Sequence, residues 1–239
     1  LNPRCEIQID QSKLFDVDPY IASLWYMAYM LGISSPTQRQ QRNMYRHLQF
    51  MDERFVVPHH SLSGLYFSCT YHNQDAVRRV KSIVNKAIKA KKEPPKFENN
   101  PDPKSIAIVT ERWHRNHAVY KSASPLVEQL VGNYKLTLIW TNPPGTEPDT
   151  IVKDYFDKVV HCYFQQGGHL VIPDELLKND FQMVYFPDVG MSDESIWLSN
   201  FRMAPIQAVG YGHPDTTGDG NEIDYFICGQ VEKDADEAY

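Results

Sequence analysis

The sequence is poor in the patterns that mark several protein classes. Its 239 residues include only four cysteines, which are widely scattered and form no CxxC pair. This spacing argues against a cysteine-based zinc site and against a disulfide framework in a chain of this length. Neither GxGxxG nor GxxxxGKS/T occurs. The sequence therefore does not predict a complete NAD site or a P-loop.

Long hydrophobic runs and a surplus of basic residues are also absent. An uncharged stretch covers residues 19–37, but its apolar part, 21–33, is too short for a comfortable membrane span. No basic segment precedes an apolar run at the start of the chain, so we expect no signal peptide. The formal net charge is −6, whereas nucleic-acid-binding proteins usually carry a basic face. These features predict a cytoplasmic protein without a transmembrane segment or a nucleic-acid partner.

The composition is that of an ordinary globular protein, with 42% hydrophobic and 12% aromatic residues. A chain of this length can bury a sizeable core. It begins with leucine rather than methionine and ends within an acidic stretch. We therefore expect it to be a domain of a longer protein.

Residues 15–92 have mainly helical periodicity, and we expect residues 1–92 to form a helical domain. Apolar residues recur at spacings of three and four over 20–31, and Asp18 followed by Pro19 is a typical helix start. Residues 37–51 and 74–92 are two further candidate helices, and residues 52–72 have no clear pattern. Residues 93–104 contain four prolines and two asparagines, so we interpret them as a linker.

In residues 105–239, short apolar runs alternate with helical patterns. The runs cover residues 106–109, 136–140, 159–164, 183–186, 206–211 and 223–228. The helical patterns cover residues 118–131, 150–157, 173–179 and 193–199. Short uncharged runs are typical of strands that are buried on both faces. The sequence therefore predicts an α/β domain with a parallel sheet, preceded by a helical domain.

Polar residues follow three of these predicted strands directly. TERWHRNH follows the first at 110–117, PDVGMS follows the fourth at 187–192, and GHPDTTGDG follows the fifth at 212–220. In an open parallel sheet, ligands bind beyond the carboxyl ends of the strands. We therefore expect these histidine, aspartate, threonine and glycine residues to meet at one edge of the sheet.

The residues alone leave the chemistry of this edge open. His114 and His117 are too few to hold zinc, because no third ligand stands at a matching helical spacing. One interpretation of His117 is that it lies at the start of a helix and makes only local hydrogen bonds. Its imidazole, kept neutral by the positive helix end, can also donate to a sugar oxygen or accept a proton. The loop around His213 is equally consistent with a simple turn and with close approach to a polyol or phosphate.

The segment APIQAVGYGHPDTT at 204–217 closely resembles a motif of one glycosyltransferase family. This family contains the O-linked N-acetylglucosamine transferases and the HMW1C-type adhesin glycosyltransferases. The GHP form of the motif, with FPDVGM at 186–191 and SNFRMAP at 199–205, looks more like the HMW1C branch. NHAVYKS at 116–122 also resembles that branch, although Asn116 replaces a glycine there. The resemblance covers roughly residues 106–224.

The resemblance implies a GT-B architecture, in which two Rossmann-like domains face each other across a cleft. Residues 105–239 would be the acceptor-side domain, and the nucleotide-binding half would lie outside this chain. The implied activity is inverting transfer from a UDP-sugar to an Asn, Ser or Thr side chain of an acceptor protein, without a metal or another cofactor. The chain alone is then expected to be inactive.

The resemblance also implies site residues. His117 and His213 are expected to be catalytic, with His117 the better candidate for a general base. Five residues are expected to bind substrate: Asn116, Asp188, Gly212, Thr216 and Thr217. An alternative function is a non-catalytic accessory module that helps a partner enzyme to recognise its substrate, because a fold does not fix a function.

Overall fold

The computed structural model describes residues 9–30, 37–58, 62–70, 74–91, 94–149, 154–210 and 216–228. The chain divides into two compact units. The helical unit contains Leu1–Lys92 and Asp215–Asn221, and the sheet unit contains Glu93–Pro214 and Glu222–Tyr239. Within the described ranges, no helix is both long enough and apolar enough to cross a membrane.

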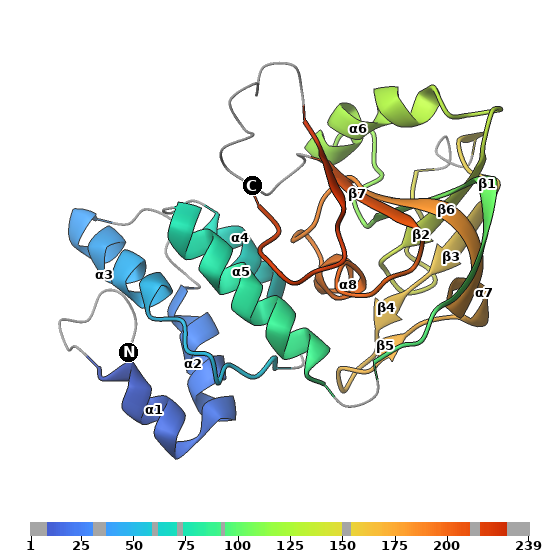
Figure 1. The fold of residues 1–239 in the computed structure, drawn as a ribbon. Helices are drawn as coiled ribbons and strands as arrows, with labels where there is room; N and C mark the ends of the chain where they lie inside the picture. The colour runs from blue at the N-terminus through green and yellow to red at the C-terminus, as the bar shows by residue number, and fades with distance from the viewer. Residues whose placement is uncertain are drawn as a thin grey trace. The chain divides into compact units, whose positions relative to one another are not determined.

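The helical unit contains five described helices (Figure 1). They are α1 (Gln11–Val17), α2 (Pro19–Met30), α3 (Gln38–Gln49), α4 (Leu62–Cys69) and α5 (Gln74–Lys89). The helices predicted at 20–31, 37–51 and 74–92 are confirmed as α2, α3 and α5. The Asp18 carboxylate accepts hydrogen bonds from the backbone N–H groups of Tyr20 and Ile21, which explains why α2 begins there.

A buried histidine lies in the core of the helical unit. The His47 ring stacks between Tyr26 and Tyr29, with ring centroids 4.0 and 4.2 Å away. Its Nε2 lies 2.8 Å from the Tyr26 carbonyl oxygen and its Nδ1 lies 3.2 Å from the Gln11 amide nitrogen. Burial lowers the pKa of His47 to about 4, so the imidazole is neutral at physiological pH.

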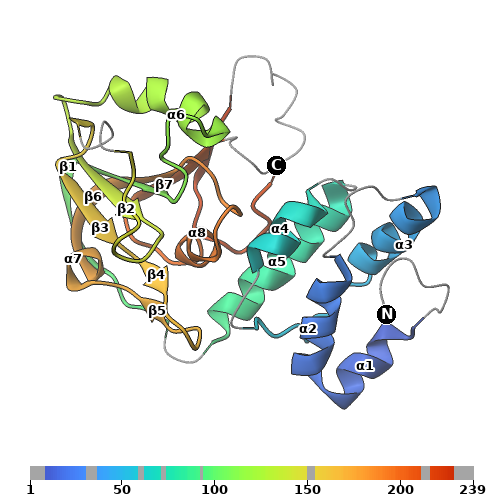
Figure 2. The ribbon, with the colours of Figure 1, turned by 180° about the vertical axis from the view of Figure 1, so that it is seen from behind.

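The sheet unit is built around a six-stranded parallel sheet, as Figures 1 and 2 show. Its strands are β1 (Glu98–Thr110), β2 (Lys135–Trp140), β3 (Lys158–His161), β6 (Lys178–Phe186), β7 (Ile206–Gly210) and β8 (Tyr225–Ile227). Their spatial order is β3-β2-β1-β6-β7-β8. This is the strand order of a Rossmann fold, so the predicted fold class is confirmed. An antiparallel hairpin of β4 (Tyr163–Phe164) and β5 (Leu170–Val171) follows β3.

Helices lie on both faces of this sheet. Figure 1 shows α6 (Ala118–Glu128) above the sheet and α8 (Asp193–Leu198) below it. Ala123 and Val127 of α6 pack in one buried cluster with Ile108 of β1 and Leu138 of β2. A short helix, α7 (Asp174–Leu177), precedes β6. The helices predicted at 118–131, 173–179 and 193–199 are thus present in shorter form.

Three expectations from the sequence are corrected. Residues 98–104 are the first half of β1 rather than a linker. Pro101 and Pro103 have no backbone N–H, and the pairing of β1 with β6 shifts register on both sides of Asp102, which lets the strand include them. No α-helix covers residues 154–157, the described part of the candidate helix at 150–157. Residues 215–221 cluster with the helical unit rather than with the sheet domain.

Candidate functional site

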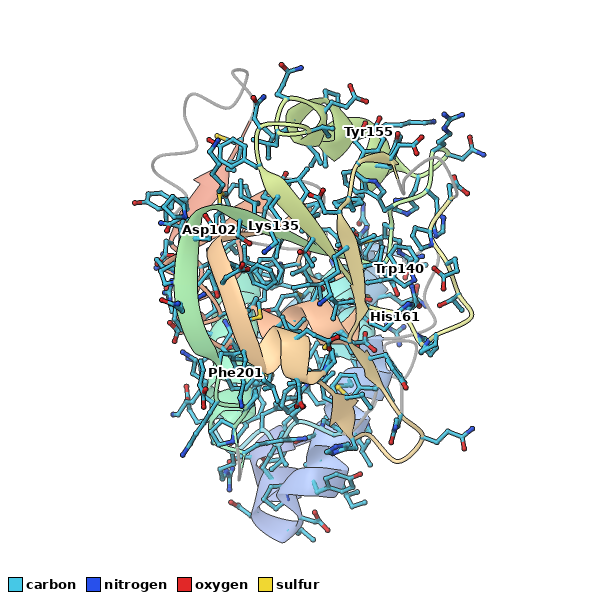
Figure 3. The ribbon with its side chains drawn as sticks, turned by 90° about the vertical axis from the view of Figure 1, so that its right-hand side faces the viewer. Asp102, Lys135, Trp140, Tyr155, His161 and Phe201 are labelled. Carbon is cyan, nitrogen blue, oxygen red and sulfur yellow. The ribbon has the colours of Figure 1, made fainter. Side chains whose placement is uncertain are left out.

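The candidate site lies at the carboxyl edge of the sheet, where the strand order reverses. From β1 the chain moves outward through β2 and β3, and it then returns to β6 on the other side of β1. Loops that leave β1 and β6 therefore diverge, and such a switch point is where open α/β sheets bind ligands. Figure 3 labels Trp140 and His161, which pair at the carboxyl ends of β2 and β3, and Lys135 at the opposite end of β2.

A hydrogen bond joins the two loops at this point. The Thr110 hydroxyl, at the end of β1, donates to Asp188 Oδ2 over 2.9 Å. The backbone N–H of Arg112 donates to the same hydroxyl oxygen, also over 2.9 Å. Asp188 is completely buried, and its Oδ1 has no hydrogen-bond partner among the described residues. Burial raises the pKa of Asp188 to about 6, against the opposing effects of Thr110 and Arg112.

The loop after β1 is held by a buried tryptophan. Trp113 is 0% exposed, and its ring makes edge contacts with Tyr120 of α6 and Phe156. The Arg115 backbone N–H donates to Asp149 over 3.0 Å. These contacts fix the path of the loop, while Asn116 remains exposed at its tip.

His117 ends this loop and is the N-cap of α6. Its Nδ1 accepts a hydrogen bond of 3.2 Å from the backbone N–H of Val119. Burial, followed by the nearby Arg112 and His114, lowers the pKa of His117, so its ring is neutral at pH 7. A neutral imidazole with an acceptor Nδ1 carries its proton on Nε2. His117 can therefore donate a hydrogen bond through Nε2, but it has no free ring nitrogen to accept a proton while the cap is intact.

Two acidic residues with raised pKa values, Glu111 and Glu194, were not among the site residues expected from the sequence. Glu194, on α8, accepts a hydrogen bond of 3.0 Å from the Phe164 backbone N–H, and burial raises the pKa of Glu194 to about 7. Burial also raises the pKa of Glu111, and the nearby Asp188 and Asp193 raise it further while Arg112 opposes them. No sequence pattern distinguishes these carboxyl groups, because their perturbation comes from burial in the folded loops.

The structure describes two of the four remaining predicted site residues. Thr216 and Thr217 belong to the segment that clusters with the helical unit. Their hydroxyl oxygens accept hydrogen bonds within the segment, Thr216 from the Gly218 N–H and Thr217 from the Asn221 amide. Gly212 and His213 lie outside the described residues. Across the described part of the chain, no three His, Cys, Asp or Glu side chains are placed to hold a metal ion.

Comparisons with known proteins identify relatives of the chain. No family model matches it. Two proteins from strains of Actinobacillus pleuropneumoniae, both named UDP-glucose:protein N-beta-glucosyltransferase, are each 25% identical to it. The alignments cover 76% of this chain and 30% of the serotype 5b protein, and 94% of this chain and 38% of the serotype 7 protein. The chain thus spans about a third of the length of these relatives.

A solved structure has a similar fold. A mutant O-GlcNAc transferase from Thermobaculum terrenum matches with a TM-score of 0.57 and 18% identity. The match covers 96% of this chain and 45% of that protein. Together the comparisons agree with the resemblance seen in the sequence: the chain is similar to two proteins named UDP-glucose:protein N-beta-glucosyltransferase, and it shares its fold with part of an O-GlcNAc transferase.

Proposed function

We propose that this chain is the helical and acceptor-side part of an inverting glycosyltransferase that transfers a sugar from a UDP-sugar to protein side chains. The observation that carries the proposal is the sequence similarity to two proteins named UDP-glucose:protein N-beta-glucosyltransferase. The Rossmann strand order and the divergent loops at the ends of β1 and β6 provide a suitable site.

The relatives' name favours glucose as the sugar and a nitrogen as the acceptor atom. Glucose is α-linked to the diphosphate in UDP-glucose, so a β-linked product requires inversion at the anomeric carbon. In such a step the acceptor nitrogen forms a bond to that carbon, and the bond to the diphosphate oxygen breaks with its electron pair leaving on UDP. The proton that the nitrogen loses passes to the departing diphosphate or to water. We propose that the step needs no metal ion, and chelation by EDTA should leave the rate unchanged.

Within this reaction we propose that His117 donates a hydrogen bond to the substrate. The capping bond from Val119 to Nδ1 leaves the Nε2–H group for an oxygen of the sugar or the diphosphate. A donor that is already in place before the reaction stabilises charge that develops in the transition state. Asp188 is completely buried, so it would act by holding the loops that follow β1 and β6 rather than by contacting the sugar.

The test uses the full-length protein that contains this chain. Purified protein is incubated with UDP-glucose, UDP-galactose or UDP-N-acetylglucosamine and with peptides that carry either Asn-x-Ser/Thr or Ser/Thr alone. We expect transfer of glucose to asparagine, detected by mass spectrometry. The 239-residue chain alone should transfer no sugar, because it spans only about a third of its relatives. A folded full-length protein that modifies no peptide with any donor would indicate an accessory module instead.

A further inference from the structure

The connection from β7 to β8 differs from the other crossovers of the sheet. The β1–β2 and β6–β7 crossovers contain α6 and α8, whereas the described part of the β7–β8 connection, residues 216–224, contains no helix. Residues 215–221 cluster with the helical unit. We call residues 216–221 the anchor segment, and its first two residues are the last two of the motif at 204–217 that carries the family resemblance.

Side chains of the helical unit bind the backbone carbonyl groups of the anchor segment. Lys81 on α5 is 0% exposed, and its Nζ donates to the Thr216 carbonyl oxygen over 2.8 Å. Asn85, one turn further along α5, donates to the carbonyl oxygens of Thr217 and Asp219 over 3.0 and 3.1 Å. The Tyr66 hydroxyl of α4 also donates to the Thr217 carbonyl, over 3.3 Å.

The far end of the anchor segment is held on the same face of α5. Arg78 donates to both carboxylate oxygens of Asp219, and Ser82 Oγ accepts from the Asp219 backbone N–H over 2.7 Å. Gly218 has a φ of +74°, and a Cβ atom there would lie 2.6 Å from the Ser82 backbone nitrogen. The segment therefore approaches the backbone of α5 so closely that only glycine fits at this position.

This arrangement specifies one conformation of the anchor segment. Burying the Lys81 amino group and the Asn85 amide costs free energy unless each is hydrogen-bonded, and both have their donors directed at carbonyl oxygens of this segment. Apolar packing is not directional. It could hold the anchor segment against α5, but it would not fix the orientation of the peptide groups of the segment. Four polar side chains of α5, at positions 78, 81, 82 and 85, converge on one short segment.

We propose that Lys81 and Asn85 are positioning residues. By fixing the carbonyl groups of Thr216 and Thr217, they hold the carboxyl end of the motif at 204–217 in the conformation that sugar transfer needs. Thr216 and Thr217 then contribute through their backbone, since their hydroxyl oxygens are engaged within the segment. This inference rests on the proposed function, and it assigns the helical unit a role in the transfer reaction.

The first measurement is amide hydrogen exchange of the 239-residue chain. Lys81→Met keeps the length of the side chain and removes its donors, and Asn85→Leu does the same for the amide. The matched control is Lys86→Met, because Lys86 lies on α5 but pairs with Glu53 at the exposed surface. We expect exchange of peptides that cover 216–221 to be at least about tenfold faster in the first two variants and unchanged in the control.

The second measurement is sugar transfer by the full-length variants, below the temperature at which any of them begins to unfold. We expect kcat to fall about tenfold or more for Lys81→Met and Asn85→Leu, with donor KM changed less, and partial recovery in Lys81→Arg. A purely structural role would lower the melting temperature and leave kcat intact. Should Lys81→Met fail to fold, Gly218→Ala perturbs the same contact from the side of the segment.

The two measurements separate the possible failures. Unchanged exchange at 216–221 in both variants overturns the anchoring role. Faster exchange with wild-type kcat and KM overturns the positioning role in catalysis. Wild-type protein that transfers no sugar overturns the proposed function and the catalytic part of this inference, while the exchange result still decides whether α5 anchors the segment.

Discussion

The Thr110 hydroxyl donates a hydrogen bond of 2.9 Å to the buried carboxylate of Asp188, and this bond joins the ends of β1 and β6. Because the strand order reverses between these two strands, the bond lies at the base of the candidate site. The Thr110 oxygen also accepts from the Arg112 backbone, so one hydroxyl fixes the start of both loops. A change at either residue should therefore affect the geometry of both loops.

Asp188→Asn should alter how stability depends on pH. The folded-state pKa of Asp188 is raised to about 6 by burial, above the value near 3.9 of an unfolded chain. The folded state thus holds more protons between pH 4 and 6, and Asp188 makes the protein less stable as pH rises through this window. The asparagine variant does not titrate, and its oxygen can still accept from Thr110. Relative to wild type, its free energy of unfolding should rise by up to about 3 kcal/mol between pH 4 and 7.

Urea unfolding at several pH values, followed by circular dichroism, measures this difference. Glu194 also has a raised pKa, but it is present in both proteins and cancels in the comparison. The pKa of Glu111 is raised in part by Asp188, so in Asp188→Asn it falls, and this adds to the expected difference in the same direction. Asp174→Asn, at an exposed carboxylate, is the control and should follow the wild-type curve within about 0.5 kcal/mol. Parallel curves for wild type and Asp188→Asn would show that this carboxyl group does not titrate abnormally.

The helical unit should have the opposite pH dependence. Burial lowers the folded-state pKa of His47 to about 4, below the unfolded value near 6.5, so the unfolded chain binds a proton that the folded state excludes. This contribution is fully present above pH 6.5 and is lost as pH falls through 4. Between pH 7 and 4.5 wild type should lose about 2–3 kcal/mol more than His47→Phe, which does not titrate.

His47→Phe is expected to be less stable than wild type at pH 7, because it leaves the Tyr26 carbonyl and the Gln11 amide without this partner. The informative quantity is therefore the slope of stability against pH rather than its value. His169→Phe is the control, since His169 is exposed. An equal slope in wild type and His47→Phe would contradict the neutral, buried state of this ring.

The parallel sheet could be predicted from the sequence because its strands are uncharged and buried on both faces. Residues 136–140 and 183–186, for example, became parts of β2 and β6. The start of β1 was misread, since prolines that mark a linker in most contexts here lie beside two register shifts. α4 was missed because it is only eight residues long and the exposed Phe67 obscures the helical spacing of its buried residues, Leu62, Leu65, Tyr66 and Cys69.

The sequence predicted some of the residues that lie at the edge of the sheet, but it did not predict contacts with distant parts of the chain. His117 and Asp188 could be placed at one edge because parallel strands end on the same side. The anchoring of Thr216 by Lys81 connects residues 135 positions apart, and no local pattern encodes such a contact. The use of His117 Nδ1 as a helix cap also depends on the exact start of α6, which periodicity does not define.

The cysteines should differ sharply in reactivity. Cys228 is exposed, whereas Cys69 and Cys162 are buried free thiols whose pKa values are raised by burial, that of Cys69 to about 11. In a Cys5→Ser background, the Cys228 thiol should react rapidly with an aromatic disulfide reagent in the native chain. The Cys69 and Cys162 thiols should react only after the chain is unfolded in urea. Cys228→Ser in that background should abolish the fast phase. A fast phase that persists would show that Cys69 or Cys162 is accessible in the native protein.

Substitutions of His117 can separate its structural role from its chemical role. His117→Ala removes the acceptor for the Val119 N–H and should cost about 0.5–2 kcal/mol of stability, whereas His117→Asn supplies another good N-cap and should be close to wild type. Both variants remove the imidazole Nε2–H donor. In the full-length protein both should therefore lower kcat about 10²–10³-fold, the usual effect of losing one donor that stabilises a transition state.

Thermal unfolding and sugar transfer by the same two preparations provide the measurement. Ser192→Ala is a useful control, because it removes the side-chain cap of α8 without touching α6. Full activity of a stable His117→Asn protein would remove the imidazole from the mechanism and leave the helix cap as its only role. Activity that is lost in His117→Ala but kept in His117→Asn would mean that transfer depends on the cap or on an amide N–H donor at this position rather than on the imidazole.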